Sequence, residues 1–203
     1  RPHIFKTKLT ERNLFMPRKN LKPGTLLCPV PIAMVTCGTV EKPNILTIAW
    51  TGIINSSPPM TYISIRPTRY SYNIIKKSKE FVINLTTSSL VKNADLCGVK
   101  SGEKVDKLKE TGLSVEAASV VSAPILSESP LSLECVVKEI KPFGTHDMFI
   151  AEIVSISVDD KILAKGGKID LKKANLAAYA HGEYFELGKS LGTFGFSVQK
   201  KPK

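Results

Sequence analysis

The stretch that decides the fold runs from Pro43 to Ser71 and reads PNILTIAWTGIINSSPPMTYISIRPTRYS. Two runs rich in β-branched and aromatic residues flank a Ser-Ser-Pro-Pro turn, a pattern that predicts two short strands joined as a hairpin. A basic loop follows and opens a helix. One compact segment therefore offers polar groups, an aromatic plane and cationic side chains. That combination suits a ligand with a flat ring at one end and a phosphate at the other.

Further elements are predicted on both sides of this hairpin. Strands are expected at residues 32–37, 44–50, 61–65, 80–85, 131–140 and 147–159, with 161–167 as a hairpin partner of the last. Helices are expected at 70–78, where Ser71 is a plausible N-cap, and at 89–98, with a charged, half-helical stretch at 99–112. The glycine-rich end from residue 175 is expected to be irregular coil.

Short strands separated by turn signals, with a few short helices, predict a mainly β fold built on a closed antiparallel sheet. A doubly wound α/β sheet is disfavoured because the strands do not alternate with long amphipathic helices. No G-x-G-x-x-G fingerprint opens a helix after a strand, so a Rossmann-type half is not indicated. The length of 203 residues fits a single domain over residues 1–203.

The chain is basic, with 29 Lys and Arg residues against 18 Asp and Glu and a net charge of +11. Such a charge suggests nucleic acid, an anionic surface or phosphorylated small molecules as partners. Most of the lysines are dispersed, and no RNP-like aromatic cluster or dense basic stripe is present. A nucleic-acid-binding β-barrel is therefore the more remote alternative, and we expect no nucleic acid. No apolar run approaches the ~18 residues of a membrane span, so we expect no membrane contact.

Cysteines and histidines give no metal site. The cysteines stand at 28, 37, 97 and 135 and the histidines at 3, 146 and 181, with no metal-ligand spacing. We expect reduced, buried, structural thiols in a cytoplasmic protein.

Several residues of the opening stretch have a functional and a structural interpretation. In an uninterrupted strand over 44–50, Asn44 and Trp50 share one face, but for each residue taken singly a turn asparagine and a core or interface tryptophan are the more common interpretation. Arg66 and Arg69 lie close to Ser71 at a helix start, where helix N–H groups, a hydroxyl and a guanidinium make an anion site. The alternative is a capped helix with solvated arginines.

The series N-x-x-T-x-x-W, S-S-P-P, R-P-x-R-x-S, E-F-V-I-N-L, D-K-L-K-E-T-G-L and G-T-H-D-M-F-I-A-E-I resembles the flavin reductase-like proteins, including flavoredoxins, over roughly residues 25–195. The resemblance implies an antiparallel split β-barrel of Greek-key type. It also implies a homodimer that holds FMN noncovalently near the subunit interface.

Carried over residue by residue, the resemblance implies a set of cofactor contacts. They are Asn44, Thr47, Trp50, Ser71 (where relatives have threonine), Lys107, His146 and Tyr179 (where flavoredoxin has phenylalanine). Arg66 and Arg69 join the set on charge and position. Without the resemblance, Lys107 is one of many lysines and is expected to face solvent, and His146 is a hairpin-turn histidine. No catalytic side chain is expected, because the flavin carries the chemistry.

The function implied is an FMN-dependent oxidoreductase. Hydride or electrons would enter from NADH, NADPH or a redox protein partner and leave to free flavin, ferric complexes or another redox protein. The main alternative is a flavoredoxin-type electron carrier without nicotinamide activity.

Overall fold

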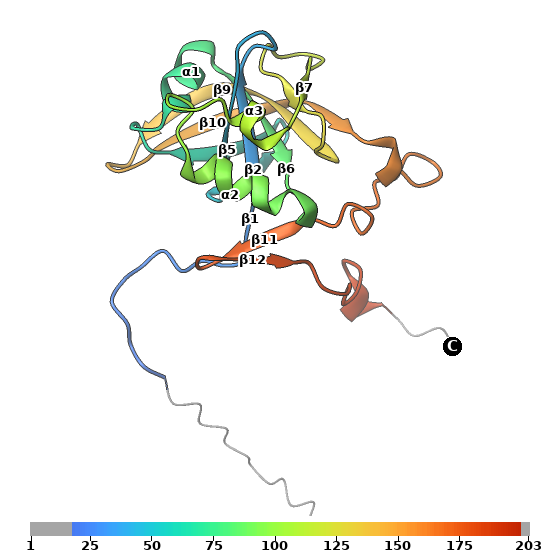
Figure 1. Cartoon of the computed structure of the whole chain (residues 1–203). Helices are drawn as coiled ribbons and strands as arrows, with labels where there is room; N and C mark the ends of the chain where they lie inside the picture. The colour runs from blue at the N-terminus through green and yellow to red at the C-terminus, as the bar shows by residue number, and fades with distance from the viewer. Residues whose placement is uncertain (1–17, 200–203) are drawn as a thin grey trace, which may run out of the picture.

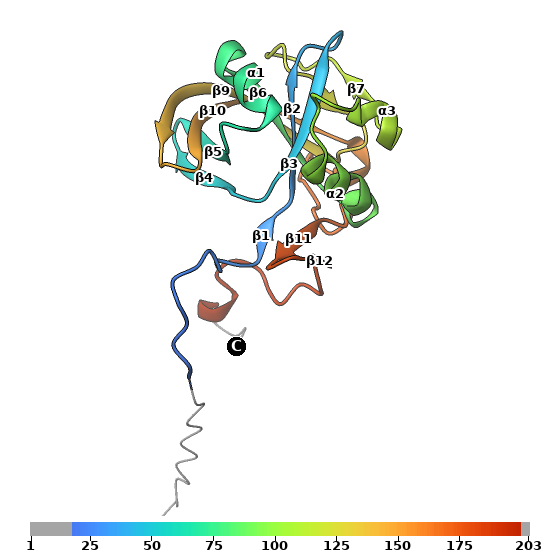
Figure 2. The same ribbon diagram turned by 60° about the vertical axis from the view of Figure 1, so that its left-hand side comes forward.

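The computed structural model describes residues 18–199, so His3 and both ends of the predicted 1–203 domain lie outside this range. The body is a seven-stranded antiparallel sheet that curls into a split β-barrel (Figures 1 and 2). In sheet order the strands are β3 (Pro43–Ile48), β2 (Ala33–Gly38), β6 (Glu80–Leu85), β9 (Leu131–Pro142), β10 (Asp147–Val158), β5 (Pro59–Ile65) and β4 (Thr51–Ser56).

Period-two alternation turns one face of the sheet inward. In β5, Thr61, Ile63 and Ile65 are buried, while the residues between them are half-buried. Phe81 of β6 and Phe149 of β10 are fully buried in the same core. Burial of these large side chains is the main force that holds the barrel closed.

Short helices cover the outside of the barrel. They are α1 (Tyr70–Ser78), α2 (Val91–Val99), α3 (Lys107–Thr111) and the 3-10 turn at Ser88–Leu90. Two further 3-10 turns lie at Asp160–Ile162 and, away from the barrel, at Phe196–Val198 (Figure 1). A two-stranded ribbon, β7 (Val115–Glu116) with β8 (Ile125–Leu126), lies near α3. None of the helices in the part of the chain that the structure describes is long and apolar enough to cross a membrane.

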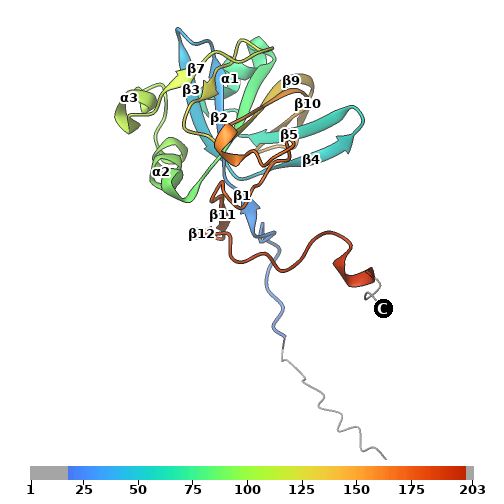
Figure 3. The same cartoon turned by 90° about the vertical axis from the view of Figure 1, so that its right-hand side faces the viewer.

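A second, three-stranded sheet lies at one end of the barrel (Figures 1 and 3). It consists of β1 (Val30–Pro31), β11 (Ala177–Ala180) and β12 (Glu183–Glu186). The segments 18–29 and 187–199 leave the body from this end, and we call them the N-terminal arm and the C-terminal arm.

The opening stretch contains three strands, so the prediction of a two-stranded hairpin was wrong. Strand β3 ends at Ile48 and not at Trp50, and the Ser-Ser-Pro-Pro turn joins the unpredicted β4 to β5. The reason is topological: β3 and β4 form the opposite edges of the large sheet. Ala49 and Trp50 carry the chain from one edge to the other, and the Trp50 carbonyl accepts a hydrogen bond from the Ser64 N–H over 3.0 Å.

Three smaller predictions also fail. Residues 161–167 form no hairpin strand, because the chain turns through a 3-10 helix at Asp160–Ile162. The end from residue 175 is not all coil, since it contains the β11–β12 hairpin. Arg69, not Ser71, is the N-cap of α1, which places Ser71 inside the first helical turn.

Candidate functional site

The barrel is split between its edge strands β3 and β4, which Ala49 and Trp50 connect. The side chain of Trp50 forms part of one wall of a cavity at this split. The side chain of Trp50 is 41% exposed. Its ring lies 4.7 Å, centroid to centroid, from the imidazole of His146, at an interplanar angle of 41°. His146 precedes β10, so the turn between β9 and β10 delivers it to the corner from the other half of the sheet. Two segments distant in sequence thus form one aromatic wall.

This wall belongs to a cavity of about 430 Å³, which we call the aromatic cavity. The predicted residues that line it are Thr47, Trp50, Arg66, Arg69, His146 and Tyr179. Its remaining lining is contributed mainly by β3, β5, α2 and the β11–β12 hairpin.

A smaller cavity of about 200 Å³ adjoins the aromatic cavity, and we call it the cationic cavity. The two share Thr47, Arg66 and Arg69 as lining residues. The cationic cavity adds Ser71 from the first turn of α1 and Lys107 from the start of α3. All of the predicted site residues except Asn44 therefore line one of these two adjoining cavities.

Asn44 lies behind the cationic cavity. It is 8% exposed, and its Nδ2 donates a hydrogen bond to the Ser71 hydroxyl over 2.5 Å. It lines a separate cavity of about 1070 Å³ between α1 and the loop before α3. The expectation that Asn44 and Trp50 share one face was wrong, because the strand that was to carry both ends at Ile48.

Lys107 is buried, contrary to the solvent-facing interpretation. The residue is 5% exposed, and its Nζ donates to the Cys97 carbonyl over 2.9 Å. Burial lowers the pKa of Lys107 from its ordinary value, and the charge of Arg69 lowers it further. An anion in the cationic cavity would stabilise the charged ammonium.

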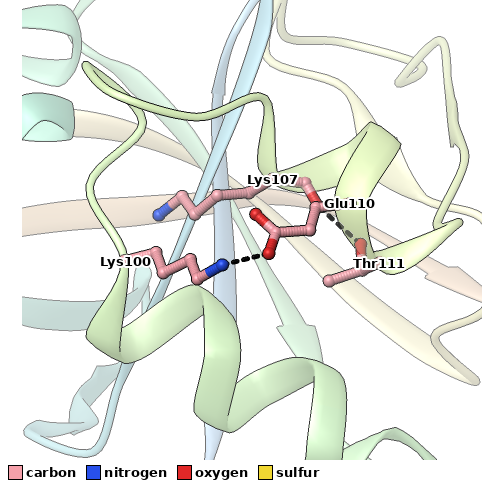
Figure 4. Close-up of polar contacts among 4 residues, drawn as sticks. All are labelled: Lys100, Lys107, Glu110 and Thr111. Carbon is pink, nitrogen blue, oxygen red and sulfur yellow. Dashed lines mark hydrogen bonds and ion pairs between the residues drawn. The ribbon is translucent and has the colours of Figure 1, made fainter.

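The neighbouring charges do not neutralise Lys107. Lys100 forms an ion pair with Glu110 of α3, and Lys107 extends away from this pair (Figure 4). The hydroxyl of Thr111 donates to the Lys107 carbonyl over 2.7 Å, which fixes the first turn of α3. The ammonium of Lys107 thus remains available to a ligand.

The two arginines make the aromatic cavity electropositive, and their charge acts on His146. The pKa of His146 is lowered, first by burial and then by the charges of Arg66 and Arg69. Arg69 is anchored, because its Nη1 donates to the Gly98 carbonyl over 3.2 Å. Within residues 18–199, neither arginine forms an ion pair.

The sequence did not single out Tyr184 and Asp95, which also line the aromatic cavity. The Tyr184 hydroxyl donates to Asp95 over 2.8 Å, and the ring of Tyr184 lies 5.5 Å from that of Tyr179. Burial, followed by the bond to Asp95, raises the pKa of Tyr184 to about 12. The alternation in the sequence AYAHGEYF was the signal for this hairpin.

The cysteine thiols show no sign of activation, although Cys97 lines the cationic cavity and binds Lys107 through its carbonyl. Cys37, Cys97 and Cys135 are buried as expected, but Cys28 is exposed. Burial raises the pKa of Cys37 to about 11 and that of Cys135 to about 12, which keeps both as unreactive thiols. Among residues 18–199, no three His, Cys, Asp or Glu side chains cluster to hold a metal.

The two cavities together fit a planar ligand with a polar edge and a phosphate. Aromatic side chains form the wall of one cavity, and hydroxyl and cationic groups line the other. The buried Oγ1 of Thr47, which lines both, has no hydrogen-bond partner among the described residues. A buried polar atom without a partner is costly, so a ligand that bonds to Thr47 would remove that cost.

Comparisons with known proteins agree with this chemistry. A family model described as "Flavin reductase like domain" matches residues 25–188, a range that contains every predicted site residue. The solved structure of a flavoredoxin from Desulfovibrio vulgaris (Miyazaki F) has a TM-score of 0.83 and 30% sequence identity, covering 90% of this chain and 100% of that one.

Two protein sequences extend the comparison. A protein of Archaeoglobus fulgidus is 32% identical over 165 residues, which cover 81% of this chain and 91% of the relative. A Rhizobium rhizogenes protein named "FMN reductase (NADH) RutF 2" is 26% identical over 107 residues, or 53% of this chain and 60% of its own length.

Proposed function

The chain belongs to the flavin reductase like domain family, and from this premise we propose that it is an FMN-binding oxidoreductase. Hydride or electrons would enter from NADH, NADPH or a redox protein and leave to an acceptor such as free flavin or a ferric complex. One observation carries the proposal: an aromatic cavity and a cationic cavity meet at the split of the barrel, and both are lined by Thr47.

The aromatic cavity would hold the isoalloxazine ring. Trp50, His146 and Tyr179 supply flat surfaces that pack against a planar ring. Thr47 offers its buried hydroxyl to the polar edge of the ring or to the ribityl chain that follows it. The name of the Rhizobium relative, an FMN reductase that uses NADH, supports the choice of cofactor and of a nicotinamide donor.

The cationic cavity would hold the phosphate. Ser71 lies in the first turn of α1, where free backbone N–H groups and the helix dipole favour an anion. Lys107 and Arg69 add charge-assisted hydrogen bonds on the other side. Asn44 contacts Ser71 and lines neither cavity, so we propose that it affects the bound phosphate only through Ser71.

The bound flavin would supply the redox chemistry. The contribution of the chain is to bind and orient that group and to shield one side of it from water. No side chain needs to act as nucleophile, acid or base in this account, in line with the absence of a predicted catalytic residue.

We also propose that the protein works as a homodimer. The side chains of Leu191 and Phe194 in the C-terminal arm are 93% and 108% exposed, and Leu27 in the N-terminal arm is 89% exposed. Both arms leave the body at the end that carries the three-stranded sheet (Figure 3), and residues 25–28 of the N-terminal arm line a hollow that also touches Trp50. A second copy that covers these apolar side chains would place its surface next to the flavin.

The second candidate is a flavoredoxin-type electron carrier without nicotinamide activity. The structural likeness to flavoredoxin favours it, since the same fold and cofactor would serve both roles. Anaerobic mixing of the flavin-loaded protein with NADH or NADPH separates the two. Bleaching of the visible flavin bands supports the reductase, and unchanged bands support the carrier.

Binding of the cofactor can be measured without turnover. Trp50 is the single tryptophan of the chain, so its fluorescence reports on the proposed ring site. Titration of the apoprotein with FMN should quench this emission to saturation at one FMN per chain. Emission that stays constant while FMN is added would contradict the placement of the ring beside Trp50.

A further inference from the structure

Arg66 and Arg69 both line the two cavities, but they occupy different positions. Arg69 is held by the Gly98 carbonyl and is the N-cap residue of α1. Its neighbours Thr68 and Tyr70 line the cationic cavity and not the aromatic one. Arg66 follows Ser64 and Ile65, which line the aromatic cavity and not the cationic one. Arg66 therefore lies at the aromatic end.

When a phosphate is bound in the cationic cavity, the positive charge of Arg66 is not needed to balance it. A phosphomonoester carries about −1.5 to −2 charges at neutral pH, and Lys107 with Arg69 supplies a matching +2 in the cationic cavity. Lys100 is neutralised by Glu110. The acid in the aromatic lining is Asp95, which accepts from Tyr184. Among residues 18–199, Arg66 forms neither an ion pair nor a side-chain hydrogen bond.

The position of Arg66 is also accessible. Its side chain is exposed, and it follows directly after the last residue of β5, at the rim of the cavity that holds Trp50 and His146. A second substrate that enters the aromatic cavity past this rim would meet the guanidinium of Arg66. An arginine there presents a planar fork of donors that matches the oxygens of a phosphate group.

We propose that Arg66 binds a phosphate group of a reduced nicotinamide dinucleotide at the rim of the aromatic cavity, and so selects the electron donor. The inference rests on the proposed function, because it takes FMN as the occupant of the two cavities. It assigns Arg66 to the second substrate, whereas Arg69, Ser71 and Lys107 serve the cofactor. The charge of Arg66 also attracts the anionic dinucleotide, an effect that salt screens.

The test measures binding of an oxidised dinucleotide, which requires no turnover. The flavin-loaded protein is titrated with NADP⁺ at low and high salt, and the dissociation constant is read from the flavin difference spectrum. In Arg66→Ala, loss of a charge-assisted hydrogen bond should weaken NADP⁺ binding about tenfold or more and flatten its salt dependence. Arg66→Lys should recover part of the loss, and the dissociation constant for FMN should change less than about twofold.

Lys165→Ala is the matched control, because Lys165 is an exposed cation that lines neither cavity. It removes the same charge and should leave NADP⁺ binding unchanged. Equal NADP⁺ affinity in Arg66→Ala and the parent protein would overturn the inference, as would a parent flavoprotein that binds no dinucleotide. Loss of FMN in Arg66→Ala would assign the arginine to the cofactor instead. A parent chain that binds no FMN would overturn the proposed function itself, which keeps the two failures distinct.

Discussion

The side-chain amide of Asn44 donates a hydrogen bond to the Ser71 hydroxyl oxygen over 2.5 Å, at the boundary between β3 and α1. Because the oxygen accepts from Asn44, the hydroxyl hydrogen of Ser71 remains free to point elsewhere. Ser71 lines the cationic cavity, so this hydrogen can be donated to a phosphate bound there. Asn44 thus acts as a positioning residue for the hydroxyl.

Replacement of Asn44 by alanine should weaken FMN binding about three- to tenfold, which corresponds to the net free energy of one hydrogen bond. The measurement is the FMN dissociation constant from Trp50 quenching. If Asn44 acts through Ser71, the effects will not add: Asn44→Ala/Ser71→Ala should bind FMN no more weakly than Ser71→Ala alone. Additive losses in the double variant would show that Asn44 acts on FMN by another route.

Gly102→Ala should reproduce the loss seen in Asn44→Ala. A Cβ at position 102 would lie 2.0 Å from Asn44 Oδ1, so one of the two residues must move. We expect a similar reduction in FMN affinity, measured by the same titration. Gly24→Ala is the control, because a Cβ there meets no atom within 4 Å. Wild-type affinity in Gly102→Ala would show that the position of Asn44 does not matter to the cofactor.

Lys107→Met keeps most of the length of the side chain and removes its charge. The variant should bind FMN at least tenfold more weakly, since a hydrogen bond between charged groups is worth about 1.5–3 kcal/mol. The apoprotein should not lose comparable stability in chemical denaturation, because burial already disfavours the ammonium, as its lowered pKa indicates. Lys109→Met, at an exposed position of the same helix, is the control. Full FMN affinity in Lys107→Met would remove Lys107 from the site.

The pKa of His146 gives a prediction that depends on pH. Burial, and then Arg66 and Arg69, hold this pKa below 6.5. Between pH 6.5 and the lower pKa of the folded protein, the imidazole is protonated in the unfolded chain but not in the folded one. The contribution of His146 to the free energy of unfolding therefore decreases as the pH falls through this range. Titration of the ring by NMR should give a pKa below 6.5, and Arg66→Ala should raise it. A pKa at or above 6.5 in the parent protein would contradict the electropositive cavity.

The C-terminal arm gives a prediction about assembly. Phe194→Asp places a charge where we expect a second copy to bury an aromatic ring, so it should shift the protein from dimer towards monomer in sedimentation equilibrium. Ser190→Asp adds the same charge to an exposed position of the same arm and should leave the dimer intact. A parent protein that sediments as a monomer would contradict the homodimer.

Much of the barrel could be predicted from local pattern. The alternation in β5 indicated the correct fold class, whereas the predicted residues that line the two cavities were named mainly from the resemblance. The role of Lys107 came from the resemblance. No local sequence pattern predicts the burial of this lysine, because the residues that bury it belong to α2 and β3.

The errors have identifiable causes. A continuous apolar run through Trp50 does not reveal that the chain changes from one sheet edge to the other at Ala49–Trp50, since that change depends on the partner strands. The β11–β12 hairpin was missed because its turn uses His181 and Gly182, both with positive φ. Such a turn is usually signalled by Asn-Gly or Asp-Gly, so the glycines were taken as a sign of coil.

The visible absorption spectrum of the purified protein, followed by release and identification of the bound group, tests the central claim most directly. The account predicts a yellow protein that releases FMN at about one molecule per chain, or a colourless apoprotein that acquires the flavin bands and loses Trp50 emission when FMN is added. A colourless protein that takes up no FMN, and instead binds an oligonucleotide with a steep salt dependence, would contradict it.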